Sequence, residues 1–169
     1  QLLFMHWRVA PDAMARLLPG GLEPDVCDGS AWVAVVPFTM RDVYPRYTFA
    51  VPRLSHFAEL NVRTYVNVGG KPGVLFFSLD AANPVAVEIA RGWYRLPYLN
   101  ARMSLVERAD GWIDYASTRT DNRGRAAELA LRYRPTGLAY RAQPGTLEWF
   151  LTERYCLYTF NAHGRLMRG

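Results

Sequence analysis

The residues best suited to chemistry alternate along one short segment, 58–66. The apolar residues between them recur at every second position, which predicts a β-strand whose successive side chains point to opposite faces. One face then carries Glu59, Asn61, Arg63 and Tyr65. A glutamate in this setting can act as a general acid or base if burial raises its pKa. This polar face can line a pocket, or it can point to solvent.

Histidine and cysteine, the other reactive residue types, follow no metal-binding spacing. His6, His56 and His163 form neither an HExxH motif nor a cluster with cysteine, so no metal site is expected. Cys27 and Cys156 are expected to be free thiols. The sequence also lacks a GxGxxG motif, a P-loop and a nucleophile elbow. We therefore expect no bound cofactor.

Length and composition indicate a globular protein. With 169 residues, 50% of them hydrophobic, the chain is expected to form one domain over 1–169 with a real core. No apolar run approaches the roughly 18 residues that span a bilayer, and no signal peptide is seen. We therefore expect a cytoplasmic protein without a membrane partner. The chain begins at Gln1 instead of Met, which suggests that it is trimmed.

The net charge of +5 is compatible with nucleic-acid binding, but the distribution of charge is not. The 20 basic residues, of which Lys71 is the only lysine, are scattered from Arg8 to Arg168 without a basic run. No RNA- or DNA-binding motif accompanies them. We expect no nucleic-acid partner.

The elements that must position these residues are mostly strands. Apolar runs bounded by turn residues predict strands, whereas a capping Asn or Thr, or an early Pro, predicts helices. The segment 39–55 has little periodicity and is predicted to be a long loop or lid, and Asp110-Gly111 predicts a tight turn. The predicted strands are 1–9, 30–38, 58–66, 74–80, 101–107, 112–119, 128–134, 157–161 and 165 onward, and the predicted helices are 11–18, 84 to about 93, and 146–155.

Several segments resemble one bacterial family. HWRV, LLPGGLEPD, AWVAVVPF, ELNVRTYV, GVLFFSLDA, LPY and FLTERYCLY are similar to segments of the uncharacterised YqjF-like family of the acetoacetate decarboxylase-like superfamily. These segments span nearly the whole chain. The resemblance implies a mainly β (α+β) fold, with an antiparallel cone-shaped barrel or curved sheets around a central pocket and about three short helices. It also implies a homo-oligomer and a chain that continues past Gly169.

The resemblance further suggests which residues contact a ligand. Arg8 corresponds to the family's pocket arginine and Glu59 to its first pocket glutamate. Asn83 reaches the second acidic position only if one inserted residue is allowed, and a helix N-cap role explains it fully. Arg63 and Tyr94 are further candidate ligand contacts. Arg8, Glu59 and Arg63 can instead form an internal ion-pair network, because buried charges must be paired in any case.

The lysine needed for Schiff-base decarboxylation is missing. Its position in the resemblance falls near Leu96, and Lys71 lies in a predicted Gly-rich turn. Schiff-base chemistry requires an amine whose pKa is lowered, usually by burial. Arginine cannot replace this amine, because its guanidinium stays protonated. We therefore expect no Schiff-base chemistry.

Two classes of function fit these observations. The first is a pocket protein that binds or transforms a small organic acid or carbonyl compound. Arg8 would anchor a carboxylate, and Glu59 would move a proton in lyase-like acid–base chemistry on a keto or hydroxy acid. The second is a non-catalytic sensor or oligomeric interaction protein that kept the barrel and lost catalysis.

Overall fold

The chain is mainly β in the computed structural model, which describes residues 1–20, 22–40, 56–161 and 163–169. The predicted mainly β class with three short helices is confirmed for these residues, and none of the helices is long and apolar enough to cross a bilayer. Of the predicted loop or lid at 39–55, Thr39 and Met40 belong to a strand, and the rest lies outside the described residues. The strands are β1 Met5–Val9, β2 Glu23–Pro24, β3 Ala31–Met40, β4 Phe57–Val68, β5 Lys71–Ala81, β6 Tyr98–Glu107, β7 Ile113–Arg119, β8 Glu128–Tyr133, β9 Leu157–Phe160 and β10 Leu166–Arg168, and the helices are α1 Pro11–Ala15, α2 Pro84–Tyr94 and α3 Leu147–Thr152.

The described residues form two compact units. Unit 1 comprises Gln1–Phe4, Ser78–Gly137 and the described part of Val36–Asn61. Unit 2 comprises Val62–Phe77 and the described parts of Met5–Val35 and Leu138–Gly169. The strands β3, β4 and β5 each contribute residues to both units.

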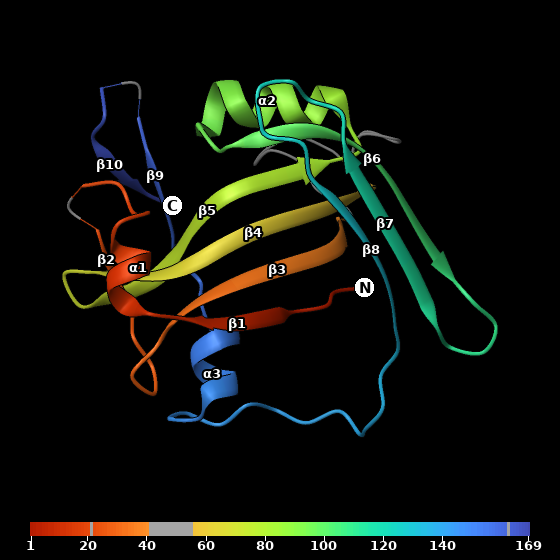
Figure 1. Cartoon of the computed structure of the whole chain (residues 1–169), viewed down its shortest axis with the longest axis horizontal. Helices are drawn as coiled ribbons and strands as arrows, with labels where there is room; N and C mark the ends of the chain where they lie inside the picture. Colours follow the sequence, from red (N-terminus) through yellow and green to blue (C-terminus); the bar gives the residue numbers. More distant parts are fainter. Residues whose placement is uncertain (21, 41–55, 162) are drawn as a thin grey trace, which may run out of the picture. The chain divides into compact units, whose positions relative to one another are not determined.

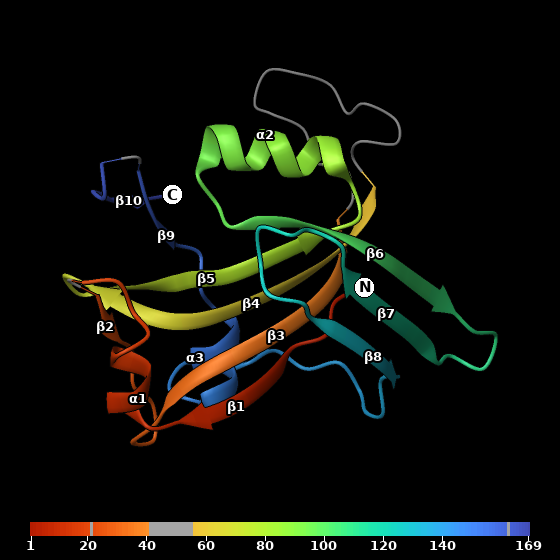
Figure 2. The ribbon, with the colours of Figure 1, turned by 45° about the horizontal axis from the view of Figure 1, so that its top comes forward.

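Unit 1 contains a parallel crossover. The end of β5 pairs in parallel with the start of β6, with Leu79 opposite Tyr98, and parallel neighbours need a crossover connection, here supplied by α2. Asn83 caps α2 by accepting a hydrogen bond from the backbone N–H of Ala86 at 3.1 Å, and Pro84 follows in the first turn. The predicted N-cap role of Asn83 is confirmed. The antiparallel strands β6, β7 and β8 follow (Figure 1, Figure 2).

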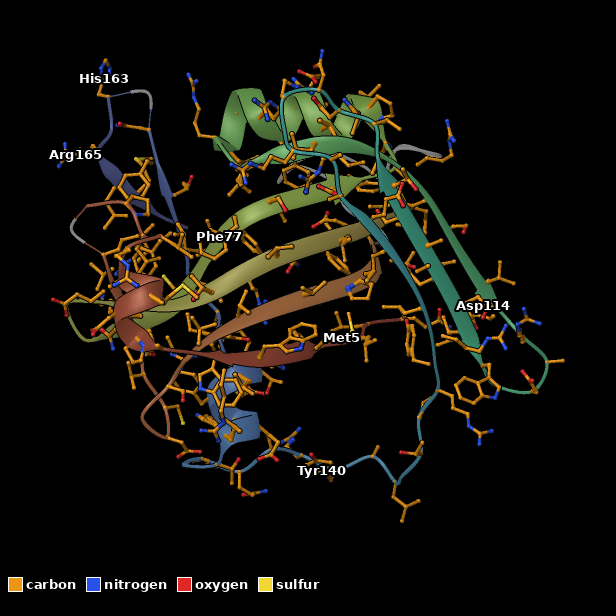
Figure 3. The ribbon with its side chains drawn as sticks, in the orientation of Figure 1. Met5, Phe77, Asp114, Tyr140, His163 and Arg165 are labelled. Atoms are coloured by element: carbon orange, nitrogen blue, oxygen red, sulfur yellow. The ribbon has the colours of Figure 1, made fainter. Side chains whose placement is uncertain are left out.

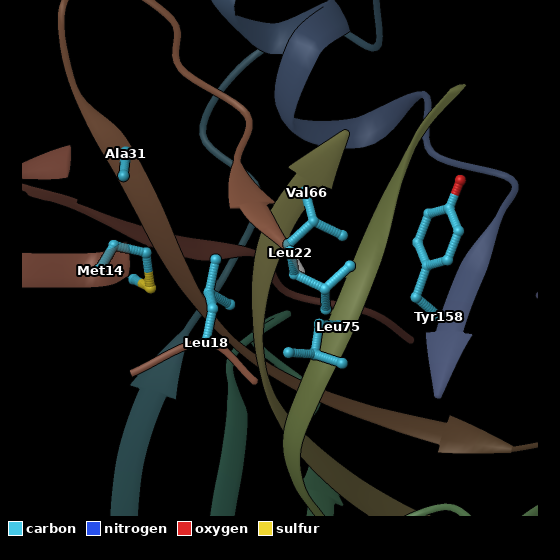
Figure 4. Close-up of a cluster of buried hydrophobic side chains, with 7 residues drawn as sticks. All are labelled: Met14, Leu18, Leu22, Ala31, Val66, Leu75 and Tyr158. Atoms are coloured by element: carbon cyan, nitrogen blue, oxygen red, sulfur yellow. The ribbon is translucent and has the colours of Figure 1, made fainter. Parts of the chain in front are cut away.

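Unit 2 holds an apolar core. β1 pairs antiparallel with the first half of β3, so that Arg8 lies opposite Trp32. β2 pairs with β4, and β9 runs parallel to β5 and antiparallel to β10. Figure 4 shows the buried cluster that these elements share with α1 and the segment after it: Met14, Leu18, Leu22, Ala31, Val66, Leu75 and Tyr158.

Two helices are shorter than predicted. α1 ends at Ala15 and α3 at Thr152, so both predicted C-terminal ends were wrong. Pro19 disfavours helical backbone in Leu18, the residue before it, and so does not account for the end of α1 at Ala15. After α3, Arg154 leaves the helix and forms a 2.7 Å ion pair with Asp25. The surroundings of the end of α3 thus come from tertiary structure, since Asp25 is far from Arg154 in the sequence.

The ends of two strands also differ from the prediction. β1 begins at Met5 and not at Gln1. β6 begins at Tyr98, before the predicted start at Ala101, because its first residues pair with β5. The predicted tight turn between β6 and β7 is confirmed, with Gly111 at a φ of 81° that favours glycine.

Candidate functional site

Strand β4 is buried on both faces, which decides where its polar side chains point. Leu60 and Val66 on its apolar face are buried, and so are Glu59, Asn61 and Tyr65 on its polar face. β4 is flanked by β3 and β5 in the sheet order (Figure 1). For these three polar side chains, the alternative in which the polar face points to solvent was therefore wrong.

Glu59 lies in unit 1 with only 2% of its surface exposed. Burial raises the pKa of its carboxyl group to about 7, because removal from water disfavours the ionised form. The hydroxyl of Tyr98 donates to Glu59 Oε2 at 3.0 Å and opposes the rise, whereas the charge of Asp80 adds to it. Glu59 can therefore take up or release a proton near neutral pH.

Two tyrosine hydroxyls from neighbouring strands hold Glu59. Tyr98 of β6 donates to the carboxyl group, and Tyr115 of β7 donates to the backbone carbonyl oxygen of Glu59 at 2.8 Å. Burial, and then the charge of Glu59, raises the pKa of both hydroxyls, so they remain neutral donors. Sequence reasoning missed both residues. The alternating pattern of the strand 112–119 is the signal that could have indicated Tyr115.

A buried ion pair between β5 and β7 completes the group of polar residues around Glu59. Asp80 of β5 accepts hydrogen bonds from Arg119 Nε of β7 at 3.0 and 3.2 Å, and Arg119 also donates to the hydroxyl oxygen of Ser78 at 3.1 Å. Burial raises the pKa of Asp80, and the hydrogen bond and charge of Arg119 oppose that rise. The sequence did not indicate this pair, because its partners are far apart along the chain.

We call this group the Glu59 cluster. It combines a carboxyl group whose pKa burial raises to about 7, a neutral hydroxyl donor and a buried ion pair. Within the part of the chain that the structure describes, no three His, Cys, Asp or Glu side chains gather as metal ligands. The cluster lies in unit 1 and consists of Glu59, Ser78, Asp80, Tyr98, Tyr115 and Arg119.

Arg8, the predicted carboxylate anchor, belongs to unit 2. Its side chain is 55% exposed, and its Nη2 lies 3.7 Å from a carboxylate oxygen of Asp28. The guanidinium carbon lies 4.8 Å from the centre of the Trp32 ring, a cation–π arrangement. Arg8 is therefore an accessible cation with an acidic neighbour, and its role as a ligand anchor stays a prediction.

Arg63 and Tyr65, on the same strand face, also belong to unit 2. The Tyr65 hydroxyl donates to the backbone carbonyl of Leu151 at 2.8 Å and lies 2.7 Å from His6 Nε2. A tyrosine hydroxyl has one proton to donate, so His6 Nε2 must donate to it. The guanidinium carbon of Arg63 lies 5.7 Å from the centre of the Tyr65 ring. Arg63 thus takes part in a polar network in unit 2.

The remaining sequence candidates lie around α2 and β5. Asn83 is the buried N-cap of α2, and Tyr94 is the last residue of that helix, about half exposed and stacked on Trp93. Lys71 is exposed at the start of β5, directly after two glycines with positive φ. The predicted Gly-rich turn at 69–73 is confirmed at Gly69 and Gly70, but its placement of Lys71 was wrong, because β5 already begins at Lys71. The part of Tyr94 in ligand binding stays a prediction.

Solved structures share the fold of this chain. An enduracididine biosynthesis enzyme, MppR, complexed with pyruvate matches with a TM-score of 0.59 and 20% identity over 99% of this chain and 65% of that chain. An acetoacetate decarboxylase matches with a TM-score of 0.60 and 17% identity over 98% and 61%. An acetoacetate decarboxylase-like enzyme from Sphingomonas wittichii RW1 matches at 0.59 and 16% over 99% and 67%. These likenesses confirm the predicted acetoacetate decarboxylase-like fold.

Sequence comparison identifies the family. The uncharacterized protein YqjF of Bacillus subtilis (strain 168) is 42% identical over 158 residues, which make up 94% of this chain. The chain spans 64% of the length of YqjF. The model of the DUF2071 family, described as an uncharacterized conserved protein, matches residues 1–169. The predicted resemblance to YqjF-like proteins is confirmed, and the chain belongs to the DUF2071 family.

Proposed function

We propose that unit 1 contains an acid–base site for a small organic acid or carbonyl compound, centred on Glu59. The observation that carries this proposal is a carboxyl group, 2% exposed, whose pKa is raised by burial to about 7. Proton transfer is most effective when the pKa of the group lies near the working pH. Strongly shifted pKa values also gather at functional sites. The proposed activity is binding or lyase-like conversion of a keto or hydroxy acid, in the cytoplasm.

Glu59 exchanges a proton with the bound molecule in this proposal. A group with a pKa of about 7 populates both protonation states at neutral pH, so Glu59 can serve as the acid or as the base. Tyr98 orients the carboxyl group through the 3.0 Å hydrogen bond to Oε2. Tyr115 holds the backbone of β4 against β7 at the same residue. Both hydroxyls are thus positioning groups.

The proposal requires no Schiff base. A lysine nucleophile must lose its solvation or lie near another cation to become reactive, whereas Lys71 is exposed at the edge of a glycine turn. The proposed chemistry therefore uses the carboxyl group of Glu59 and not an amine. Among chains with the same fold, one is an acetoacetate decarboxylase and another, MppR, is complexed with pyruvate, which is compatible with this ligand class. This chain spans 65% of the length of MppR, which is less than two thirds. The activity of the whole protein is therefore part of the proposal.

The test is ligand binding to the purified chain at pH 6, 7 and 8, with pyruvate and acetoacetate as probes in isothermal titration calorimetry. Proton uptake or release on binding is expected for the wild type and is expected to be lost in Glu59→Gln. Glu107→Gln, which changes an exposed glutamate of β6, is the matched control. Lys71→Arg is expected to retain binding. Binding that is unchanged in Glu59→Gln, or abolished in Lys71→Arg, would contradict the proposal.

One observation favours the second candidate, an oligomeric interaction protein. Val85, Ile89 and Trp93 follow one another along one face of α2 and are 52%, 50% and 80% exposed. A hollow of about 500 Å³ is lined by Glu88, Ile89, Gly92 and Trp93. An exposed apolar stripe of this kind is typical of a contact between protein copies. A dimer by light scattering that dissociates in Trp93→Ser, with Glu59→Gln unaffected in every binding assay, would favour this candidate.

A further inference from the structure

Strand β8 in unit 1 lies at an open edge of the sheet. It pairs with β7 on one side, and no strand of the described residues pairs with its other side. Such an edge presents unpaired N–H and C=O groups to any strand that can reach them, and proteins usually protect it with proline, lysine or a bulge. β8 contains neither proline nor lysine, and its register with β7 is regular along the whole strand. The edge is therefore able to accept a further strand.

The pairing with β7 decides which backbone groups of β8 are left over. The N–H of Arg119 donates to the C=O of Ala127 at 2.9 Å, so the backbone groups of Ala127 face β7. Along an antiparallel strand, successive residues direct these groups to opposite sides, because hydrogen-bonded and non-hydrogen-bonded pairs alternate. The backbone N–H and C=O groups of Glu128, Ala130 and Arg132 therefore point to the open edge.

These residues are complementary to a second copy of themselves. When two β8 strands meet antiparallel with Ala130 opposite Ala130, Glu128 of each copy lies opposite Arg132 of the other. Each of these pairs joins residues whose backbone groups point outward, as ladder hydrogen bonds require. On the other face, Leu129 lies opposite Leu131 of the other copy. Opposite charges and apolar side chains that face each other across two strands stabilise a sheet.

The charges around β8 are not balanced within one copy. Asp114, labelled in Figure 3, accepts hydrogen bonds from the Nε atoms of both Arg108 and Arg132, so two guanidinium groups share one carboxylate. Glu128 has no ion-pair partner within the described part of the chain. The Glu128 of a second copy would supply the further negative charge at Arg132.

The apolar face of β8 also lacks a neighbour on its open side. Leu129 and Leu131 lie opposite Ser117 and Tyr115 of β7, which are only 3% and 2% exposed. The two leucines themselves are only partly buried. A strand added at the edge of β8 would cover them.

We propose that β8 is a dimerisation edge, which binds the β8 of a second copy of this chain in antiparallel orientation. Each copy contributes the same residues, so the contact is two-fold symmetric and closes at two copies. The inference goes beyond the proposed acid–base function, because β8 contributes no residue to the Glu59 cluster. It also uses a surface other than the apolar stripe on α2.

Sedimentation velocity of the full chain over a wide range of concentrations tests the pairing of charges. A monomer–dimer equilibrium is expected for the wild type. Glu128→Arg is expected to weaken the dimer roughly tenfold or more, because symmetry makes two attractive pairs repulsive. Arg132→Glu is expected to do the same, and the double variant Glu128→Arg/Arg132→Glu is expected to restore the dimer. Glu23→Arg, the same change of charge at an exposed residue of β2, is the matched control.

Ala130→Pro tests the backbone part of the contact. The N–H of Ala130 points away from β7, so proline at this edge position keeps the ladder within one copy and removes a donor to the other. The variant is expected to be folded by circular dichroism and to be monomeric. Ala130→Ser keeps the N–H and is expected to remain dimeric.

Several outcomes would overturn the inference. These are a wild type that stays monomeric at every concentration, a double charge variant that does not recover the dimer, and a dimer that persists in both Glu128→Arg and Ala130→Pro. Oligomers that grow beyond two copies would also overturn it, because they require β8 to bind a different surface of the next copy. A dimer that is lost in Trp93→Ser and kept in Ala130→Pro would assign association to α2 instead.

Discussion

At the scale of single residues, burial controls which groups of this chain titrate near neutral pH. Burial raises the pKa of Glu59 to about 7. In unit 2, burial lowers the pKa of His6 to about 4, and the charge of Arg63 adds to the fall. The cause is shared, because poorly solvated surroundings disfavour the charged form of an acid and of a base alike. Neutral His6 can then donate to Tyr65, whereas Glu59 is left to exchange protons.

The raised pKa of Glu59 predicts that stability depends on pH. In the unfolded chain the carboxyl group ionises from about pH 4.5, but in the folded chain it resists ionisation until about pH 7. The folded state therefore binds more protons in this window, so its stability falls as the pH rises from about 4.5 to about 7. Glu59→Gln is expected to be more stable than the wild type at pH 8, by up to about 3 kcal/mol, and to match it more closely at pH 4.5.

Urea unfolding of both proteins across this pH range measures the difference. Glu107→Gln is again the control, since an exposed glutamate is expected to leave the pH dependence unchanged. A Glu59→Gln variant that is less stable than the wild type at pH 8 would show that the ionised carboxylate is stabilised, contrary to the argument from burial.

At the scale of elements, β5 is the strand that pairs in parallel with one strand of each unit. It pairs in parallel with β9 at Val74–Leu75 and with β6 at Leu79–Ala81. The approach of β9 is close at Gly73, where a Cβ atom would lie 2.7 Å from the backbone oxygen of Cys156 and 2.7 Å from the ring of Tyr158. Only glycine leaves room for this backbone approach.

Gly73→Ala is therefore expected to destabilise the chain by about 1–3 kcal/mol, because the added methyl group meets backbone as well as side chain. Gly92→Ala is the matched control. Gly92 lies within α2 with open space around its Cβ position, so alanine is expected to stabilise the helix by about 0.5–1 kcal/mol. Denaturant midpoints measured with unchanged m-values test both changes. A neutral Gly73→Ala would mean that β9 does not approach β5 this closely in solution.

At the scale of the whole molecule, the two units are linked by shared strands. β3, β4 and β5 each begin in one unit and end in the other. A strand that takes part in two hydrogen-bonded networks couples their unfolding, because loss of one network removes the support of residues next to the other. Independent domains, by contrast, are usually joined by exposed linkers that few contacts cross.

We therefore predict that the chain unfolds in one cooperative transition. Trp112 lies in unit 1 and Trp32 in unit 2, so variants that keep one or the other tryptophan report on each unit by fluorescence. Their urea transitions are expected to coincide with each other and with the loss of far-ultraviolet circular dichroism. Two separate midpoints would show that the units unfold independently, contrary to the single domain predicted from the sequence.

The sequence by itself determined the family, the β-rich class and the local elements. The quoted segments span most of the chain, so the resemblance to YqjF-like proteins could be recognised without coordinates. Asn83-Pro84 and Asp110-Gly111 were read correctly as a helix start and a tight turn, because caps and turns are decided by residues a few positions apart. The sequence did not decide whether Glu59 is buried, because the polar face of its alternating strand could line a pocket or point to solvent.

Tertiary structure alone decided the surroundings of the candidate site. Tyr98, Tyr115 and Arg119 meet residues on β4 and β5 that lie far from them in the sequence. The parallel pairing that starts β6 early, and the contact with Asp25 that follows the end of α3, have the same origin. Such contacts depend on which strands the folded chain brings together, and no local propensity encodes that choice. The sequence therefore indicated a carboxyl group able to move a proton if buried, and the fold supplied the burial that raises its pKa to about 7 against the opposing hydrogen bond from Tyr98.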